Sequence, residues 1–256
     1  MVKKKVRYEM RNDIVKILKK LVYIAWKDIR IYYFSAPTVM MGLLFPILMF
    51  LTFWIGKRFS IFEALPGLAA LTVFFGGSSI GVTTLALERT KGTFDTQLAM
   101  PVSLLTIILG KSIASFLYGF IITVIPVGIL MLISHHQVAN PLLFLVSIIL
   151  SAITSAGLGM ILSASAKHVH EAMTPLNIMR IPMMFISGIF IPITTLPKFL
   201  QSIAYIMPLT HTVITLQHSI IGLWPIQTFL ISIGVLFFYA TIFMIIASKK
   251  LEKSLE

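Results

Sequence analysis

Two segments carry residue types that could do chemistry on a nucleotide or a peptide. Gly110-Lys111-Ser112 resembles the end of a phosphate-binding loop, but such a loop needs a glycine where Leu105 stands, and a strand before it. Gly76-Gly77-Ser78-Ser79 could supply a nucleophilic serine to a distant histidine such as His211 or His218. The nucleotide-binding interpretation competes with a simpler one, in which Lys111 ends a membrane span and reaches lipid phosphates. The nucleophilic-serine interpretation competes with helix packing, because small residues within a span usually allow close packing of helices.

Histidine pairs are the other candidates for chemistry. His135-His136 and His168-x-His170 have too few neighbouring ligands for a metal site, and the chain has no cysteine. We therefore expect no metal, no cofactor and no catalytic residue in this chain.

The composition indicates a membrane protein. Hydrophobic residues make up 57% of the 256 residues and charged residues 12%, against about 25% charged in soluble domains. A membrane-spanning helix needs about 20 apolar residues. Six stretches reach that length: Ala36–Gly56, Leu65–Leu87, Ser112–Ser134, Leu142–Ala164, Met173–Ile193 and Ile226–Ser248. The predicted fold is an all-α membrane protein of one domain, residues 1–256.

The positions of lysine and arginine predict the orientation of these spans. With both termini in the cytoplasm, eighteen basic residues lie on the inner side, and the outer side holds only Lys57, Arg58 and Lys198. Cytoplasmic loops carry the excess of basic residues in membrane proteins. The net charge of +12 is then explained by topology and membrane lipids, so no nucleic-acid partner is needed.

Two segments outside the spans have a pattern of their own. Residues 14–33 place apolar side chains on one helical face and lysines mainly on the other, which is typical of a helix lying in the membrane surface. Such a helix could be a plain anchor or could also contact a cytoplasmic partner. Residues 194–224 are apolar but broken by Pro197 and Pro208, which predicts a re-entrant or interfacial helical hairpin on the outer side.

The connection between the second and third spans, residues 88–103, has the features of a lever. Gly92 breaks the preceding helix, Thr93 is a candidate N-cap, and a short turn over 94–100 is stopped by Pro101. A short helix held just outside the membrane could be pushed by a protein that docks from the cytoplasm.

At this point the sequence resembles the ABC-2 type permeases, the membrane subunits of many ABC exporters. Two signatures carry the resemblance, and it extends over the whole chain. The first is the connection, with matches at Glu88, Arg89, Gly92, Thr93, Leu98, Pro101, Val102, Ser103, Gly110 and Lys111. The second is Ser187-Gly188 followed by Pro192, Leu196-Pro197 and Met207-Pro208, which looks like the drug-export or lipid-export branch. Thr90 and Leu104 depart from the charged residues that the family often has there.

The resemblance implies a plasma-membrane exporter made of two permease chains, as a homodimer, and two separate ABC ATPase subunits that bind ATP and Mg²⁺. The segment 14–33 would be the connecting helix, and 88–103 the coupling segment. Residues implied to couple to the ATPase are Glu88, Arg89, Gly92, Thr93, Phe94, Asp95 and Pro101, with Phe94 as the apolar anchor. The substrate would be hydrophobic or amphipathic: a drug, a lipid or a lipid-linked glycan.

The implied substrate pathway lies along the second and fifth spans, and consists of Phe74, Phe75, Arg180, Met184, Phe185 and Phe190. Arg180 is an intramembrane charge and has two readings. It could face a cavity, attracting an anionic headgroup or pairing with Glu88 or Glu171, or it could extend back to the inner membrane surface.

Two other functional classes stay open on the sequence. A stand-alone secondary transporter would usually have acidic residues deep in its spans, and none of the nine acidic residues is placed there. An intramembrane enzyme would need a nucleophile and a base that lie together.

Overall fold

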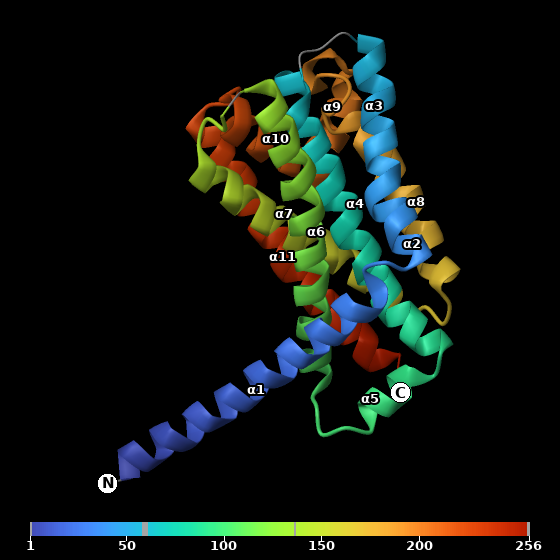
Figure 1. Cartoon of the computed structure of the whole chain (residues 1–256), viewed down its shortest axis with the longest axis vertical. Coiled ribbons are helices and arrows are strands. Elements are labelled where there is room, and N and C mark those ends of the chain that lie inside the picture. The colour runs from blue at the N-terminus through green and yellow to red at the C-terminus, as the bar shows by residue number, and fades with distance from the viewer. Residues whose placement is uncertain (1, 58–60, 136, 255–256) are drawn as a thin grey trace.

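The computed structural model describes residues 2–57, 61–135 and 137–254, and in these ranges the chain consists of helices joined by short turns and loops, with no strand (Figure 1). Arg58 lies outside the described residues. The elements in chain order are α1 (Val2–Tyr32), α2 (Ala36–Thr38), the π-helix η1 (Val39–Leu44), α3 (Phe45–Lys57), α4 (Ile61–Thr90), α5 (Thr93–Leu98), α6 (Leu104–Ser134), α7 (Pro141–Ser163), α8 (Val169–Ile186), the 3₁₀ turn η2 (Ile193–Thr195), α9 (Lys198–Ile206), α10 (Pro208–Ile221) and α11 (Ile226–Lys253). The prediction of an all-helical fold is confirmed for these residues.

Four described helices are long and apolar enough to cross a membrane: Ala64–Thr90, Leu104–Ile133, Pro141–Ser163 and Ile226–Lys253. They coincide with four of the six predicted spans. The predicted span Ala36–Gly56 is divided into α2, η1 and α3, and Met173–Ile193 corresponds to the shorter α8. The six-span topology therefore stays a prediction.

Helix α4 lies at the centre of the bundle, and its most apolar stretch is completely buried inside the protein. Small residues let its neighbours approach closely. A Cβ atom added to Gly77 would lie 2.2 Å from Ser155 Oγ of α7, and one added to Gly159 of α7 would lie 2.3 Å from the carbonyl oxygen of Ser78. The segment Gly76–Ser79 is thus a packing surface, as its small residues indicated.

Ser78 makes no hydrogen bond with a histidine among the described residues. The Ser78 hydroxyl donates to the carbonyl of Phe74, 2.6 Å away in the same helix. His211 of α10 pairs with a different serine, with Nδ1 3.1 Å from Ser232 Oγ, and its Nε2 lies 2.9 Å from the carbonyl oxygen of Tyr205. The intramembrane-enzyme reading therefore loses the pairing of Ser78 with a histidine that the sequence suggested.

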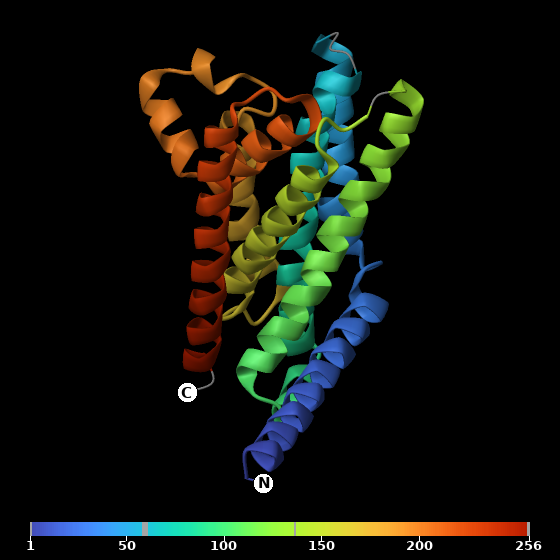
Figure 2. The same ribbon diagram turned by 90° about the vertical axis from the view of Figure 1, so that its left-hand side faces the viewer.

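The predicted hairpin over 194–224 is a bent pair of helices. α9 and α10 meet at an angle of 86° where Met207 precedes Pro208, because proline cannot continue the hydrogen bonding of the first helix. Whether the pair re-enters the membrane stays a prediction. In Figures 1 and 2, α9 lies at the opposite end of the bundle from the two termini and α5.

Helix α1 leaves the bundle obliquely (Figure 1), and its last turns pack on the other helices. Ala25, Asp28 and Tyr32 are buried there, whereas Ile17 and Leu18 remain about half exposed. It packs closely on α6, where a Cβ atom added to Gly110 would lie 2.8 Å from the side chain of Ile24. The glycine that resembled part of a nucleotide-binding loop is therefore a helix-packing point.

Candidate functional site

The connection between α4 and α6 is built as the sequence predicts, with one change at the cap. Gly92 has φ of +68° and ends α4 in the left-handed region that favours glycine. The short helix α5 then runs from Thr93 to Leu98. Gly92 is therefore the N-cap of α5, and the Thr93 hydroxyl donates instead to the carbonyl of Glu88, 3.4 Å away. Ser103 caps α6 by accepting a hydrogen bond from the amide of Thr106 at 3.2 Å.

Phe94 fixes α5 to the bundle. Its side chain is 2% exposed and packs in an apolar cluster with Leu85 of α4, Ile107 and Ile108 of α6, and Leu251 of α11. The Arg89 guanidinium carbon lies 5.3 Å from the centre of its ring. The expectation that Phe94 is an apolar anchor for another protein is therefore corrected: this ring is already buried in its own chain.

Arg89 also has partners within the chain. Its Nη2 donates to Ser254 Oγ after α11 at 2.6 Å, and its Nη1 lies 3.5 Å from the carbonyl oxygen of Ala166 between α7 and α8. These contacts fasten three ends of the bundle to the last turn of α4. Four of the predicted coupling residues, Gly92, Thr93, Asp95 and Pro101, are exposed. The rest of the exposed surface of the connection is made by Thr90, Lys91, Thr96, Ala99, Met100 and Ser103.

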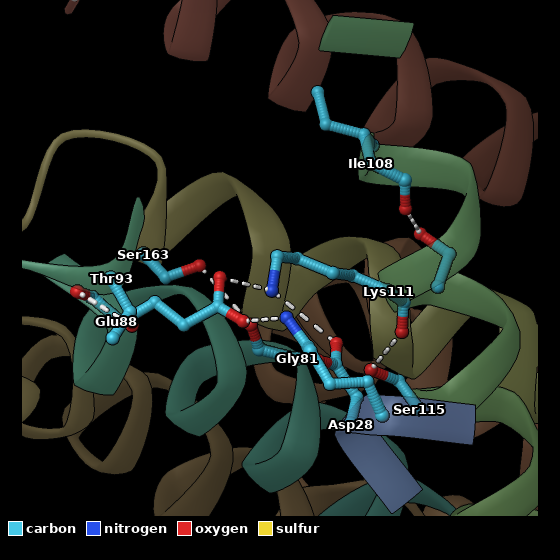
Figure 3. Close-up of polar contacts among 10 residues, drawn as sticks. Asp28, Gly81, Glu88, Thr93, Ile108, Lys111, Ser115 and Ser163 are labelled. Carbon is cyan, nitrogen blue, oxygen red and sulfur yellow. Dashed lines mark hydrogen bonds and ion pairs between the residues drawn. The ribbon is translucent and has the colours of Figure 1, made fainter. Parts of the chain in front are cut away.

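Four ionised side chains meet beside this connection, and their charges cancel. Lys111 Nζ of α6 lies 2.5 Å from Glu88 Oε2 of α4 and 3.3 Å from Asp28 Oδ2 of α1. Lys27 Nζ pairs with the other Glu88 oxygen and lies 3.1 Å from Asp28 Oδ1. Figure 3 shows the Lys111 ammonium between the carboxylates of Glu88 and Asp28. We call Lys27, Asp28, Glu88 and Lys111 the charge cluster.

Burial makes the charge cluster a strong constraint on three helices. The side chains of Asp28 and Lys111 are 0% exposed and that of Glu88 is 1% exposed. Asp28 Oδ1 and Glu88 Oε2 accept no hydrogen bond, so ion pairs alone balance them. Removing one partner from such a cluster typically costs about 3–5 kcal/mol, because an unpaired charge is left behind.

The position of the charge cluster changes two sequence-based expectations. Glu88 is turned into the bundle, so it holds α4 to α1 and α6 and is not free to contact an ATPase. Lys111 is fully buried and ion-paired, so it does not reach lipid phosphates. One signal for the cluster existed in the sequence: Asp28 is the only acidic residue within 14–33, and it falls on the helical face that carries Leu21, Ala25 and Tyr32.

Arg180 of α8 lies deep in the bundle against α4. Its Nη1 donates to Ser79 Oγ at 2.9 Å, to Ser78 Oγ at 3.1 Å and to the carbonyl of Phe75 at 3.3 Å. Its Nε donates to Asn177 Oδ1 at 2.9 Å, and the guanidinium carbon lies 4.4 Å from the centre of the Phe75 ring. The side chain is 0% exposed. The reading in which it extends to the membrane surface is therefore wrong.

Neither predicted carboxylate partner reaches Arg180. Glu88 belongs to the charge cluster. Glu171 lies at the start of α8, where its Oε2 accepts hydrogen bonds from the amides of Lys167 at 2.8 Å and His168 at 3.4 Å. These backbone hydrogen bonds, that of Lys167 first, lower the pKa of Glu171. Within the described residues, no ion pair joins Arg180 to an acidic side chain.

The other predicted pathway residues divide into two groups. Phe74, Phe75, Met184 and Phe190 are buried in the main apolar core, whereas Phe185 is 38% exposed. The ring centres of Phe185 and Phe190 lie 5.8 Å apart. In this conformation these residues lie close together at the contact of α4 with α8 and the turn after it. An apolar groove of about 210 Å³, which the sequence did not reveal, lies elsewhere, between α3, α4 and α6; Ile47, Phe50, Leu51, Leu68, Pro126, Ile129 and Leu130 line it.

Comparison with known proteins decides the family of this bundle. A sequence profile described as "ABC-2 type transporter" matches residues 19–221. The chain belongs to the ABC-2 type transporter family. The match begins in the second half of α1 and runs to the end of α10, so it includes the charge cluster, α5 and Arg180. The resemblance seen in the sequence is thereby confirmed, and the family assignment identifies a membrane-embedded protein.

Two curated proteins are similar to part of this chain. The chain is 25% identical over 147 residues to the "Probable multidrug ABC transporter permease YbhR" of Escherichia coli K12, which is 57% of this chain and 40% of that protein. It is 29% identical over 108 residues to "Nodulation protein J" of Rhizobium leguminosarum bv. viciae, which is 42% of this chain and 41% of that protein. The chain thus matches about two fifths of the length of these relatives.

Proposed function

We propose that this chain is the membrane-spanning subunit of an ATP-driven exporter, and that a separate ATPase drives it through α5. The observation that carries the proposal is the α4–α6 connection of an ABC-2 family member. A buried phenylalanine and a buried charge cluster fix this connection on its inner side, and its outer side is left exposed. A short helix that is fixed in this way can transmit the movement of a docked protein to α4 and α6.

The contact with the ATPase is carried by the exposed face of α5 and the residues after it. Asp95 and Met100 lie on that face, with Met100 52% exposed, and they combine an acidic contact with an apolar one. Glu88, Arg89 and Phe94 act behind this face by positioning α5. The ATP, the Mg²⁺ and the catalytic residues for hydrolysis then belong to the ATPase subunit.

The assembly is a homodimer of this chain with two ATPase subunits in the plasma membrane. Its six spans place both termini and α5 in the cytoplasm, which agrees with the common end at which they lie (Figure 1). Helix α1 lies at the inner membrane surface as the connecting helix, and α9 with α10 forms the outer hairpin.

The substrate is a hydrophobic or amphipathic molecule that moves outward by alternating access along α4 and α8. Support comes from the apolar and aromatic side chains at the contact of these helices, Phe74, Phe75, Met184 and Phe190. The printed name of the Escherichia coli relative, a multidrug permease, points the same way. A pathway opens between these side chains when α8 moves away from α4.

Co-purification from native membranes tests the proposal. The chain, solubilised in mild detergent, should retain an ABC ATPase in equal amount. Met100→Asp should abolish that association, because it puts a charge at the apolar contact, and Leu105→Asp is the matched control, since Leu105 is 56% exposed but lies beyond the connection. A chain that purifies alone and moves solute without ATP would instead be a secondary transporter.

A further inference from the structure

Arg180 is a buried cation whose hydrogen bonding is incomplete. Its side chain is 0% exposed and four described contacts use Nε and Nη1, but Nη2 has no hydrogen-bond partner. A guanidinium stays charged in proteins and presents its donors as a planar fork. Leaving one arm of that fork unpaired inside a bundle is costly.

The described part of the chain does not supply the missing negative charge. Among the described residues, the two lysines and two carboxylates of the charge cluster balance one another, and no ion pair joins any acidic side chain to Arg180. A buried charge without a partner is rare, and inside a membrane it usually serves function. The counter-charge for Arg180 therefore has to come from a molecule other than this chain.

Polar groups on α4 define what that molecule carries. Ser78 and Ser79 already face Arg180. Thr83 follows Ser79 by four residues and so lies on the same face of α4. Its hydroxyl is buried and also has no hydrogen-bond partner. A guanidinium fork beside several hydroxyl donors suits an anionic group with three or four oxygens, such as a phosphate.

We propose that Arg180, Ser79 and Thr83 form a binding site for the phosphate headgroup of an amphipathic molecule. This inference rests on the proposed function and adds to it that the exported substrate is anionic. The apolar part of the ligand lies along the aromatic residues Phe75 and Phe190. When α8 and α4 separate, the headgroup occupies the space between them and takes the place of their direct contact. Electrostatic attraction to Arg180 then makes an anionic amphiphile the preferred ligand over a neutral one of equal chain length.

Binding of dodecyl phosphate to the purified complex in neutral detergent tests the site without any transport step. With the complex in dodecyl maltoside, added dodecyl phosphate should raise the midpoint temperature of unfolding. Additional dodecyl maltoside should not raise it. Arg180→Gln should weaken the binding about ten- to a hundredfold, the usual effect of losing a charge-assisted contact. Arg180→Lys should retain part of it, because the charge remains. Equal binding by the wild type and Arg180→Gln would overturn the proposal.

Thr83→Val gives a second test that does not depend on the folding of the arginine variants. It should weaken binding about fivefold through the loss of one hydrogen bond. Thr210→Val is the matched control, since the Thr210 hydroxyl is also buried and unpartnered but lies on α10, and it should leave binding unchanged. Equal effects of Thr83→Val and Thr210→Val would also count against the site.

Transport in vesicles separates the two sources of such a headgroup. ATP-dependent export of a fluorescent alkyl phosphate that depends on Arg180 identifies the headgroup as that of the substrate. Retention of one anionic phospholipid per chain, lost in Arg180→Gln, identifies a resident membrane lipid; the site then stands, but the claim that the substrate is anionic fails. If binding is present and no ATP-dependent transport is found for any amphiphile, the proposed function fails while the site stands.

Discussion

The charge cluster and the Arg180 region both bury ionised side chains, but only the first is electrically complete. In the cluster, Lys111 has carboxylates at 2.5 Å and 3.3 Å from two other helices. Arg180 has hydroxyls, one carbonyl, one amide oxygen and an aromatic ring around it. A balanced set of buried charges holds helices in one arrangement, whereas an unbalanced buried charge favours the binding of a molecule with the opposite charge. We therefore assign the cluster to mechanical coupling and Arg180 to recognition.

The largest effect is expected from breaking the charge cluster. Lys111→Met should lower the free energy of unfolding by about 3–5 kcal/mol, because Glu88 and Asp28 are left with one partly exposed lysine. Unfolding of the detergent-solubilised protein by denaturant measures this change. The double variant Lys111→Met with Asp28→Leu should recover most of the loss, since it removes a cation and an anion together. A single variant as stable as the wild type would contradict the assignment.

Detaching α5 should have the next largest effect. Phe94→Ala should cost about 3 kcal/mol, because a large buried side chain leaves a cavity among α4, α6 and α11. Hydrogen exchange of the α5 amides should rise, and ATP hydrolysis in the complex should no longer be coupled to transport. Met100→Ala is the exposed counterpart and should change stability by less than about 0.5 kcal/mol. If α5 keeps its exchange protection without Phe94, the proposed anchoring is wrong.

Removing the charge of Arg180 should cost much less stability than removing that of Lys111. Arg180→Gln loses several hydrogen bonds, but it also removes a buried charge without a counter-ion, and the two effects offset each other to within about 1 kcal/mol. The same unfolding assay applies to both variants. A loss as large as that of Lys111→Met would mean that Arg180 is a structural link like those of the cluster, and the contrast between the two regions would disappear.

The smallest effect concerns the exposed start of α8, the helix that carries Arg180. The pKa of Glu171 is lowered by the backbone amides of Lys167 and His168, so folding favours its ionised form. Its contribution is complete above the ordinary value of 4.5 and is lost as the pH falls through the lower pKa of the folded state. The protection of the Lys167 and His168 amides, measured relative to their intrinsic exchange rates, should therefore fall below that pH, and Glu171→Gln should remove most of this pH dependence.

Most of the fold predictions that agree with the structure depend on hydropathy and on turn residues. Four spans, the break at Gly92 and the stop at Pro101 depend on local patterns, and they appear where the sequence places them. The bend at Pro208 was equally local. The first and fifth predicted spans were less regular, since η1 divides one of them and α8 contains Asn177 and Arg180.

The candidate sites were harder to predict because they depend on pairings between distant residues. Lys111 and Asp28 are separated by 83 positions, and Lys27 and Glu88 by 61. The sequence marks Asp28 as an acidic residue on an apolar helical face, but it does not indicate that Lys111 and Glu88 join it. A local sequence pattern also does not determine the direction of a side chain. On a short amphipathic turn, Phe94 could point away from the bundle or into it. It points into the bundle because α6 and α11 form an apolar cluster there.

The most direct test of the account is transport by inside-out vesicles that contain the chain together with its ATPase. We predict uptake of an amphipathic fluorescent probe that requires Mg²⁺ and ATP. Met100→Asp should abolish that uptake while the protein stays folded, and Leu105→Asp should leave it unchanged. Uptake that continues without ATP, or that is indifferent to a charge at position 100, would contradict the claim that a separate ATPase drives this chain through α5.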